Sequence, residues 1–125
     1  MTPASIETEA HPTKAIPHLP AANLKATRDW YVRYLGFRAY EHLRDFLILE
    51  RESVVLHFYL SNKPGATDAG TLYLNVEGDI DALCIRMRAD GAVAENDAPT
   101  DQNYGKREFT ARDPDGRPVF IGKPI

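Results

Sequence analysis

The sequence has 125 residues, of which 43% are hydrophobic and 26% are charged, a composition typical of one soluble globular domain. Its net charge of −3 lacks the basic excess of proteins that bind the phosphate backbone of nucleic acids. No apolar run approaches the roughly 18 residues of a membrane span, and the N-terminus lacks the pattern of a signal peptide. We therefore expect a cytoplasmic protein that binds neither nucleic acid nor membrane.

The residue types exclude several kinds of chemistry. Cys84 is the only cysteine, so the chain has no intrachain disulfide and no thiolate cluster for zinc or iron–sulfur. We interpret it as a buried small hydrophobe. No serine nucleophile motif or glycine-rich phosphate loop is present. Four histidines remain as candidate ligands, of which His11 and His42 are expected to be in solvent.

The first half of the chain predicts one helix among extended segments. Residues 1–13 have no period and are interpreted as a flexible arm. The pattern at 24–35 predicts a helix that Asn23 caps and Gly36 ends. Strands are predicted on both sides of this helix, at 14–21, 37–43, 45–50 and 53–60.

The second half repeats this order after a polar connection at 61–70, which contains two glycines and one proline. Residues 79–90 predict a helix capped by Asp79, and a loop follows at 95–103. Strands are predicted at 71–78, 106–112 and 117–122, the last two joined by an Asp-Pro-Asp-Gly turn.

The extended–helix–glycine unit thus recurs at an offset of roughly 55 residues. It predicts an α+β fold of two βαβββ modules, at about 14–60 and 71–125, within a single domain spanning 14–125. One helix can cover only one face of a four-stranded sheet. Each module therefore keeps an open face, and two such faces can meet as a cup lined by side chains.

Three stretches of sequence resemble one superfamily. They are WYVRYLGF at 30–37, DFLILERESVVL at 45–56 and YGKREFTARDPDG at 104–116. Together they are similar to the vicinal oxygen chelate superfamily, which includes glyoxalase I, ring-cleaving dioxygenases and bleomycin resistance proteins. The third stretch resembles the bleomycin resistance branch in particular. The resemblance implies a cupped sheet in a strand-exchanged dimer.

The resemblance also locates where a metal ion would bind. Superfamily enzymes hold a divalent metal at positions that correspond to Ile16, Thr71 and Phe120, and none of these side chains is a convincing ligand. We therefore expect no metal, no other cofactor and no catalytic residue. One alternative stays open, a replacement metal site built from His18, His57 and Glu108, which would suit a glyoxalase-like or dioxygenase-like enzyme.

Without a metal ion or a nucleophile, the function left to consider is the binding of a ligand by aromatic rings and carboxylates. The loop at 95–104 is acidic, and acidic residues on neighbouring strands favour a cationic ligand. The resemblance implies that Phe46 and Tyr104 contact drug, with Tyr104 standing where tryptophan is familiar. The predicted ligand-binding residues are His18, Phe46, His57, Phe58, Tyr73, Tyr104, Glu108 and Phe120.

The resemblance implies an antibiotic-binding resistance protein. A homodimer with two crevices would sequester bleomycin-type glycopeptides without chemical modification, and the prolines around the first strand suit its exchange between subunits. Two alternatives remain: the metalloenzyme of the same fold, and a binder of another planar cationic small molecule.

Overall fold

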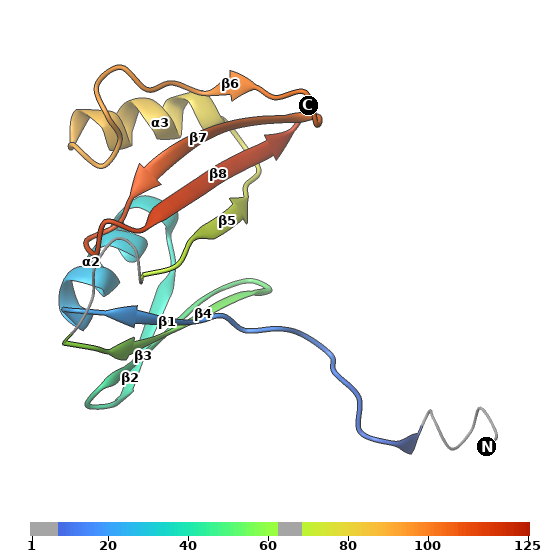
Figure 1. Ribbon diagram of the computed structural model, residues 1–125, viewed down its shortest axis with the longest axis vertical. Coiled ribbons are helices and arrows are strands. Elements are labelled where there is room, and N and C mark those ends of the chain that lie inside the picture. The colour runs from blue at the N-terminus through green and yellow to red at the C-terminus, as the bar shows by residue number, and fades with distance from the viewer. Residues whose placement is uncertain (1–7, 63–68) are drawn as a thin grey trace.

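The computed structural model describes residues 8–62 and 69–125, which form two modules of the same topology (Figure 1). The first module contains β1 (His18–Ala21), α2 (Leu24–Leu35), β2 (Arg38–Leu43), β3 (Phe46–Arg51) and β4 (Val54–Leu60). Its four strands lie in the order β1-β4-β3-β2, with β1 parallel to β4 and the other pairs antiparallel.

The second module contains β5 (Leu72–Asn75), α3 (Ile80–Ala89), β6 (Thr100–Asp101), β7 (Lys106–Arg112) and β8 (Pro118–Pro124). Its strand order, β5-β8-β7-β6, repeats that of the first sheet. The predicted α+β fold of two βαβββ modules is confirmed. The prediction of a loop over 95–103 was wrong in one part, because these residues include the strand β6. A strand of two residues is too short to show alternation in the sequence.

The helices begin and end where the sequence indicates. The Asn23 side chain accepts a hydrogen bond from the Ala26 amide at 3.0 Å, and the Asp79 side chain does the same for the Ala82 amide. Gly36 ends α2 in the left-handed conformation, at φ 70°. Local sequence therefore determines both helix starts and the turn from α2 into β2.

Each helix covers one face of its own sheet. Side chains alternate along a strand, so one set on each sheet points to the helix and is buried. Facing α2 are Leu19, Ala21, Leu47, Leu49, Leu56 and Phe58, and facing α3 are Leu72, Phe109, Ala111, Val119 and Ile121. The alternate residues form the second face of each sheet, which carries no helix and is called here the open face.

A buried ion pair joins the two modules. Arg117 and Asp113, on either side of the turn between β7 and β8, are both buried and form a salt bridge. The Asp113 carboxylate also accepts a hydrogen bond from the Tyr31 hydroxyl of α2 at 2.8 Å, and Arg117 donates to the carbonyl of Pro20 at the end of β1. The guanidinium lies 5.3 Å from the centre of the Phe58 ring.

This junction sets the direction in which the first sheet faces. Phe58 belongs to the face that packs against α2, and the turn that carries Arg117 reaches the same face. The second module therefore lies on the helix side of the first sheet, as Figure 1 also shows. The open face of the first sheet points away from the second module, and the two open faces do not meet within this chain.

The described part of the N-terminal arm runs away from both modules (Figure 1). Residues 8–15 are exposed, and the strand β1 begins only at His18. Residues 1–7 of the predicted arm and 63–68 of the predicted connection lie outside the described residues. No helix within 8–62 and 69–125 is both long and apolar enough to pass through a lipid bilayer.

Candidate functional site

Three predicted site residues lie together on the open face of the first sheet. His18 on β1 is paired in register with His57 on β4, and the two rings are 4.8 Å apart between centroids. Phe46 on β3 lies edge-on to both rings, at 5.8 Å from His18 and 5.1 Å from His57. We call His18, Phe46 and His57 the histidine patch. It offers ligands an aromatic surface with ring nitrogens at its edge.

The two imidazoles of the histidine patch are in direct contact. His57 Nδ1 and His18 Nε2 are 3.1 Å apart. Partial burial, followed by the proximity of His18 and then of Lys14, lowers the pKa of His57 below its ordinary value. His57 is therefore held in the neutral form to lower pH than a free histidine would be.

Four other predicted site residues gather on the second sheet. The Glu108 carboxylate of β7 accepts hydrogen bonds from the Tyr73 hydroxyl of β5, at 2.6 Å, and from the Tyr104 hydroxyl. The rings of Tyr73 and Phe120 are nearly parallel, with an interplanar angle of 17° and centroids 6.3 Å apart. We call Tyr73, Tyr104, Glu108 and Phe120 the tyrosine patch. It combines flat rings with one oriented carboxylate.

The hydrogen bonds to Glu108 also affect the tyrosines. Loss of solvation, followed by the bond to the carboxylate, raises the pKa of Tyr73 to about 12. For Tyr104 the bond to Glu108 is the main cause of a raised pKa. Both phenols therefore remain protonated hydrogen-bond donors at neutral pH.

The backbone of β8 makes room for this arrangement. A Cβ atom at Gly122 would overlap the Tyr73 hydroxyl. Glycine at this position lets Tyr73 cross over β8 and reach Glu108 on β7, two strands away. Lys106 lies at the border of the patch, where it donates to the Asn75 side chain at 2.6 Å.

The prediction for Phe58 was wrong. Its side chain is fully buried between Tyr31 of α2 and the Arg117 guanidinium, on the face opposite to His57. Neighbouring residues of a strand point to opposite faces, so His57 and Phe58 cannot both line the open face.

The residue that sequence reasoning missed is Tyr59, which is 42% exposed and pairs with Phe46 in the register of β3 and β4. Alternation from His57 would have found it.

The three residues of the alternative metal site do not come together within the chain. His18 and His57 are adjacent, but Glu108 is on the second sheet and is bound by two tyrosines. Within 8–62 and 69–125, no cluster of three or more His, Cys, Asp or Glu side chains is arranged to hold a metal ion. His11 is exposed in the arm as predicted, and the side chain of His42 lies outside the described residues.

The metal positions of superfamily enzymes also do not fit a divalent ion here. Ile16 and Phe120 have no donor atom in their side chains, and Thr71 has only a neutral hydroxyl.

Cys84 is fully buried on α3, as predicted, and burial raises the pKa of its thiol. It is therefore not an exposed thiolate ligand.

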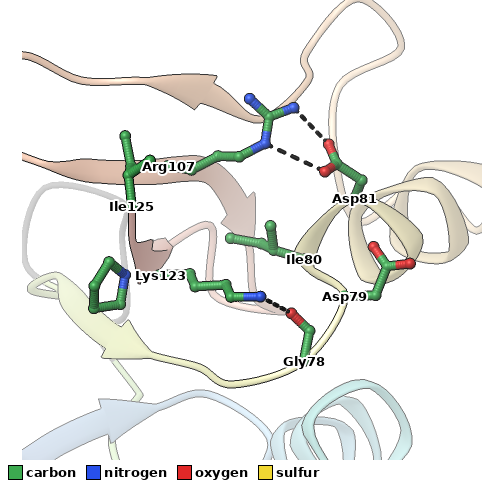
Figure 2. Close-up of a pocket in the computed structure, with 8 residues that line it drawn as sticks. Gly78, Asp79, Ile80, Asp81, Arg107, Lys123 and Ile125 are labelled. Carbon is green, nitrogen blue, oxygen red and sulfur yellow. Dashed lines mark hydrogen bonds and ion pairs between the residues drawn. The ribbon is translucent and has the colours of Figure 1, made fainter.

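A shallow pocket of about 470 Å³ lies elsewhere, near the start of α3 (Figure 2). Arg107 in this pocket binds Asp81 at 2.7 Å, and Lys123 donates to the carbonyl of Gly78 at 2.6 Å. Arg107 alternates with Glu108 along β7, so the pocket is on the helix side of the sheet and not on the open face. Arg107 is paired with the Asp81 and Asp101 carboxylates, and the Lys123 ammonium is held by a backbone carbonyl, so both side chains are engaged in contacts within the chain.

Comparison with known proteins identifies the family. The profile of the Glyoxalase/Bleomycin resistance protein/Dioxygenase superfamily matches residues 10–119. The chain belongs to this superfamily. Bleomycin resistance proteins from Geobacillus stearothermophilus and Staphylococcus aureus are similar to it, at 27% identity over 128 residues, covering 90% of this chain and 97% of theirs.

Three solved structures have the same fold. A bleomycin-binding protein from Streptomyces verticillus, in complex with copper(II)-bleomycin, matches with a TM-score of 0.65 and 28% identity, covering 90% of this chain and 97% of that one. A bleomycin-binding protein in complex with bleomycin has a TM-score of 0.71 at 21% identity, with coverage of 91% and 100%. TioX from Micromonospora has a TM-score of 0.73 at 19% identity, also covering 91% and 100%.

Proposed function

We propose that this protein binds bleomycin-type glycopeptide antibiotics and sequesters them without making or breaking a covalent bond. The observation that carries the proposal is the composition of the two open faces, where flat rings border a carboxylate held by two tyrosine hydroxyls. Bleomycin-type molecules combine a planar bithiazole with a positively charged tail. The relatives named bleomycin resistance proteins support the same ligand class.

The residues of the two patches have separate parts in this proposal. Phe46 and the rings of the tyrosine patch offer stacking surfaces for the planar part of the ligand. Glu108 attracts the cationic part, because its carboxylate is oriented by Tyr73 and Tyr104. His18 and His57 supply ring edges and hydrogen-bonding nitrogens beside Phe46.

The proposed binding unit is a homodimer. The two open faces do not meet within one chain, so a second copy is required to bring a histidine patch opposite a tyrosine patch. The exposed residues 8–15 extend away from both modules and can reach a partner. A two-fold symmetric dimer built in this way contains two crevices, each with one face from each chain.

The metalloenzyme alternative is less well supported by the residues. The side chains of Ile16, Thr71 and Phe120 do not form a donor set for a divalent ion, so no reaction step is assigned to these positions. The remaining alternative is a different planar cationic ligand, which the same two patches would suit. It is distinguished from bleomycin by a binding measurement.

Calorimetric titration of the chelator-treated protein with bleomycin tests the proposal, with the drug free of metal and loaded with copper. We expect one drug per subunit and a dissociation constant well below micromolar, which corresponds to a binding free energy better than roughly −8 kcal/mol. The substitutions Phe46→Ala and Tyr104→Ala should each weaken binding by about 1–2 kcal/mol, or about 5- to 30-fold.

The matched control is Ile85→Ala, which removes an exposed apolar side chain on α3, away from both patches. It should leave the affinity unchanged. Absence of measurable binding by the unmodified protein would exclude bleomycin and favour another planar cation. Equal affinity for Phe46→Ala, Tyr104→Ala and the unmodified protein would show that drug binds elsewhere.

A further inference from the structure

The histidine patch contains two imidazoles whose ring nitrogens face each other at hydrogen-bonding distance. His18 and His57 are direct neighbours in the parallel pair of β1 and β4, so their side chains leave the sheet side by side on its open face. His57 Nδ1 and His18 Nε2 are 3.1 Å apart. In a single chain, neither ring is covered by the second module, which lies on the other side of this sheet.

This separation is the one expected for two ligands of one metal ion. Imidazole nitrogens bind first-row transition ions at about 2.0–2.1 Å, so two neighbouring ligands of a tetrahedral or octahedral ion lie about 2.9–3.4 Å apart. Phe46 lies edge-on to both rings and limits the orientations they can adopt. A small outward movement of the two rings would let both nitrogens point at one ion without changing the strands.

We propose that His18 and His57 together bind one divalent transition-metal ion on the open face of the first sheet. This site differs from the metal positions of superfamily enzymes, which fall on Ile16, Thr71 and Phe120 in this chain. Among the described residues, no third His, Cys, Asp or Glu joins the pair, so the ion keeps open positions for water or for an added ligand.

The two ligand atoms determine which ion binds. Neutral imidazole suits copper, nickel and zinc, and at a site of this kind the affinity for Cu²⁺ exceeds that for Ni²⁺ and Zn²⁺. Two protein ligands hold an ion more weakly than the three or four of a resident metal centre. We therefore expect an exchangeable site, loaded when copper is supplied and emptied by a chelator.

Titration of the full-length protein with Cu²⁺ alone, without any drug, tests this inference. We expect one high-affinity ion per chain and an electron paramagnetic resonance spectrum with coupling to two imidazole nitrogens. Loss of an outer partner of a metal ligand already costs about 10- to 100-fold in affinity, so His18→Gln and His57→Gln should each weaken binding at least about tenfold. Each variant should also lose one nitrogen coupling.

Glutamine is chosen because it retains a hydrogen-bonding group on the strand and so keeps the fold intact. His11→Gln is the matched control, since His11 is an exposed histidine in the arm that lies outside the patch. Its Nδ1 donates a hydrogen bond to the Glu9 carbonyl. This substitution should not change the copper affinity or the spectrum. Circular dichroism of each variant verifies the fold before titration.

The inference is overturned if the double variant His18→Gln/His57→Gln binds copper as tightly as the unmodified protein, or if the loss follows His11→Gln instead. It does not depend on the proposed antibiotic binding, because the titration contains no drug. Failure of bleomycin to bind leaves the copper result unaffected. Failure of copper to bind likewise leaves the titration with metal-free bleomycin unaffected.

Discussion

At the scale of single residues, the most informative arrangement is Glu108 between two tyrosines. Two phenol donors on one carboxylate fix the direction of its charge. Such a carboxylate is suited to attract an external cation. The Glu108 carboxylate contributes to the raised pKa of both tyrosine hydroxyls, which can be tested by titration of the tyrosines.

Glu108→Gln is expected to lower the pKa of Tyr73 from about 12 toward the ordinary value near 10, although burial will retain part of the shift. A phenol whose pKa is raised in the folded state contributes to the free energy of unfolding, and this contribution is fully present below about pH 10, the pKa of a free tyrosine. This contribution is lost as the pH rises through about 12, and Glu108→Gln should reduce it. Ultraviolet absorbance of tyrosinate against pH, with Tyr73→Phe to assign the signal, measures the shift. An unchanged titration of Tyr73 in Glu108→Gln would contradict the hydrogen bond.

The sequence predicted most of the two patches, but not their internal contacts. Aromatic residues in segments expected to line or border the cup indicated Phe46, Tyr73, Tyr104 and Phe120 as candidates. Which face each residue occupies follows from alternation, and applying it strictly to the run at 57–59 would have separated Phe58 from its neighbours. The bond from Tyr73 to the β7 carboxylate could not be predicted, because β8 comes between β5 and β7 only in the folded sheet.

At the scale of elements, local signals in the sequence were sufficient to predict where α2 begins and ends. Asn23 and Gly36 delimit α2 at the residues predicted, because capping and left-handed backbone are properties of a few neighbouring residues. The strand β6 is the exception. Its two residues form a strand because they pair with β7, so its existence depends on a distant segment.

Removal of the α2 cap gives a test at this scale. Asn23→Ala should reduce the free energy of unfolding by about 1 kcal/mol, because the Ala26 amide loses its side-chain acceptor. Asn23→Gly should cost only a few tenths of a kcal/mol, since an exposed amide next to glycine is readily solvated. Urea denaturation of both variants measures the difference. Equal losses for alanine and glycine would show that the Asn23 side chain does not act as a cap.

At the scale of the whole molecule, the two modules depend on the ion pair at their junction. The Asp-Pro-Asp-Gly sequence at 113–116 predicts a hairpin turn, and the turn is present, with the Gly116 amide donating to the Asp113 carbonyl. Its role in joining the modules could not be predicted. The partner of Asp113 on α2 is 82 residues away, and the Pro20 carbonyl is 97 residues from Arg117.

Arg117→Ala is expected to reduce the free energy of unfolding by about 3–5 kcal/mol, because it leaves the Asp113 charge buried without its partner. Arg112→Ala is the control, since Arg112 belongs to the same turn region but is exposed, and its guanidinium donates to the Gly116 carbonyl. It should change the stability by no more than about 0.5 kcal/mol. Urea unfolding measures both, and a loss below 1 kcal/mol for Arg117→Ala, as for a surface residue, would contradict a structural role for the pair.

The separation of the two open faces within one chain has a genetic consequence. In the proposed dimer, each crevice takes its histidine patch from one chain and its tyrosine patch from the other. A homodimer of Phe46→Ala chains, or of Tyr104→Ala chains, is damaged in both crevices. A mixed dimer of the two has one crevice with both defects and one with neither. Two alleles that each fail alone should therefore complement each other when they are co-expressed, whereas a site confined to one chain would show no complementation.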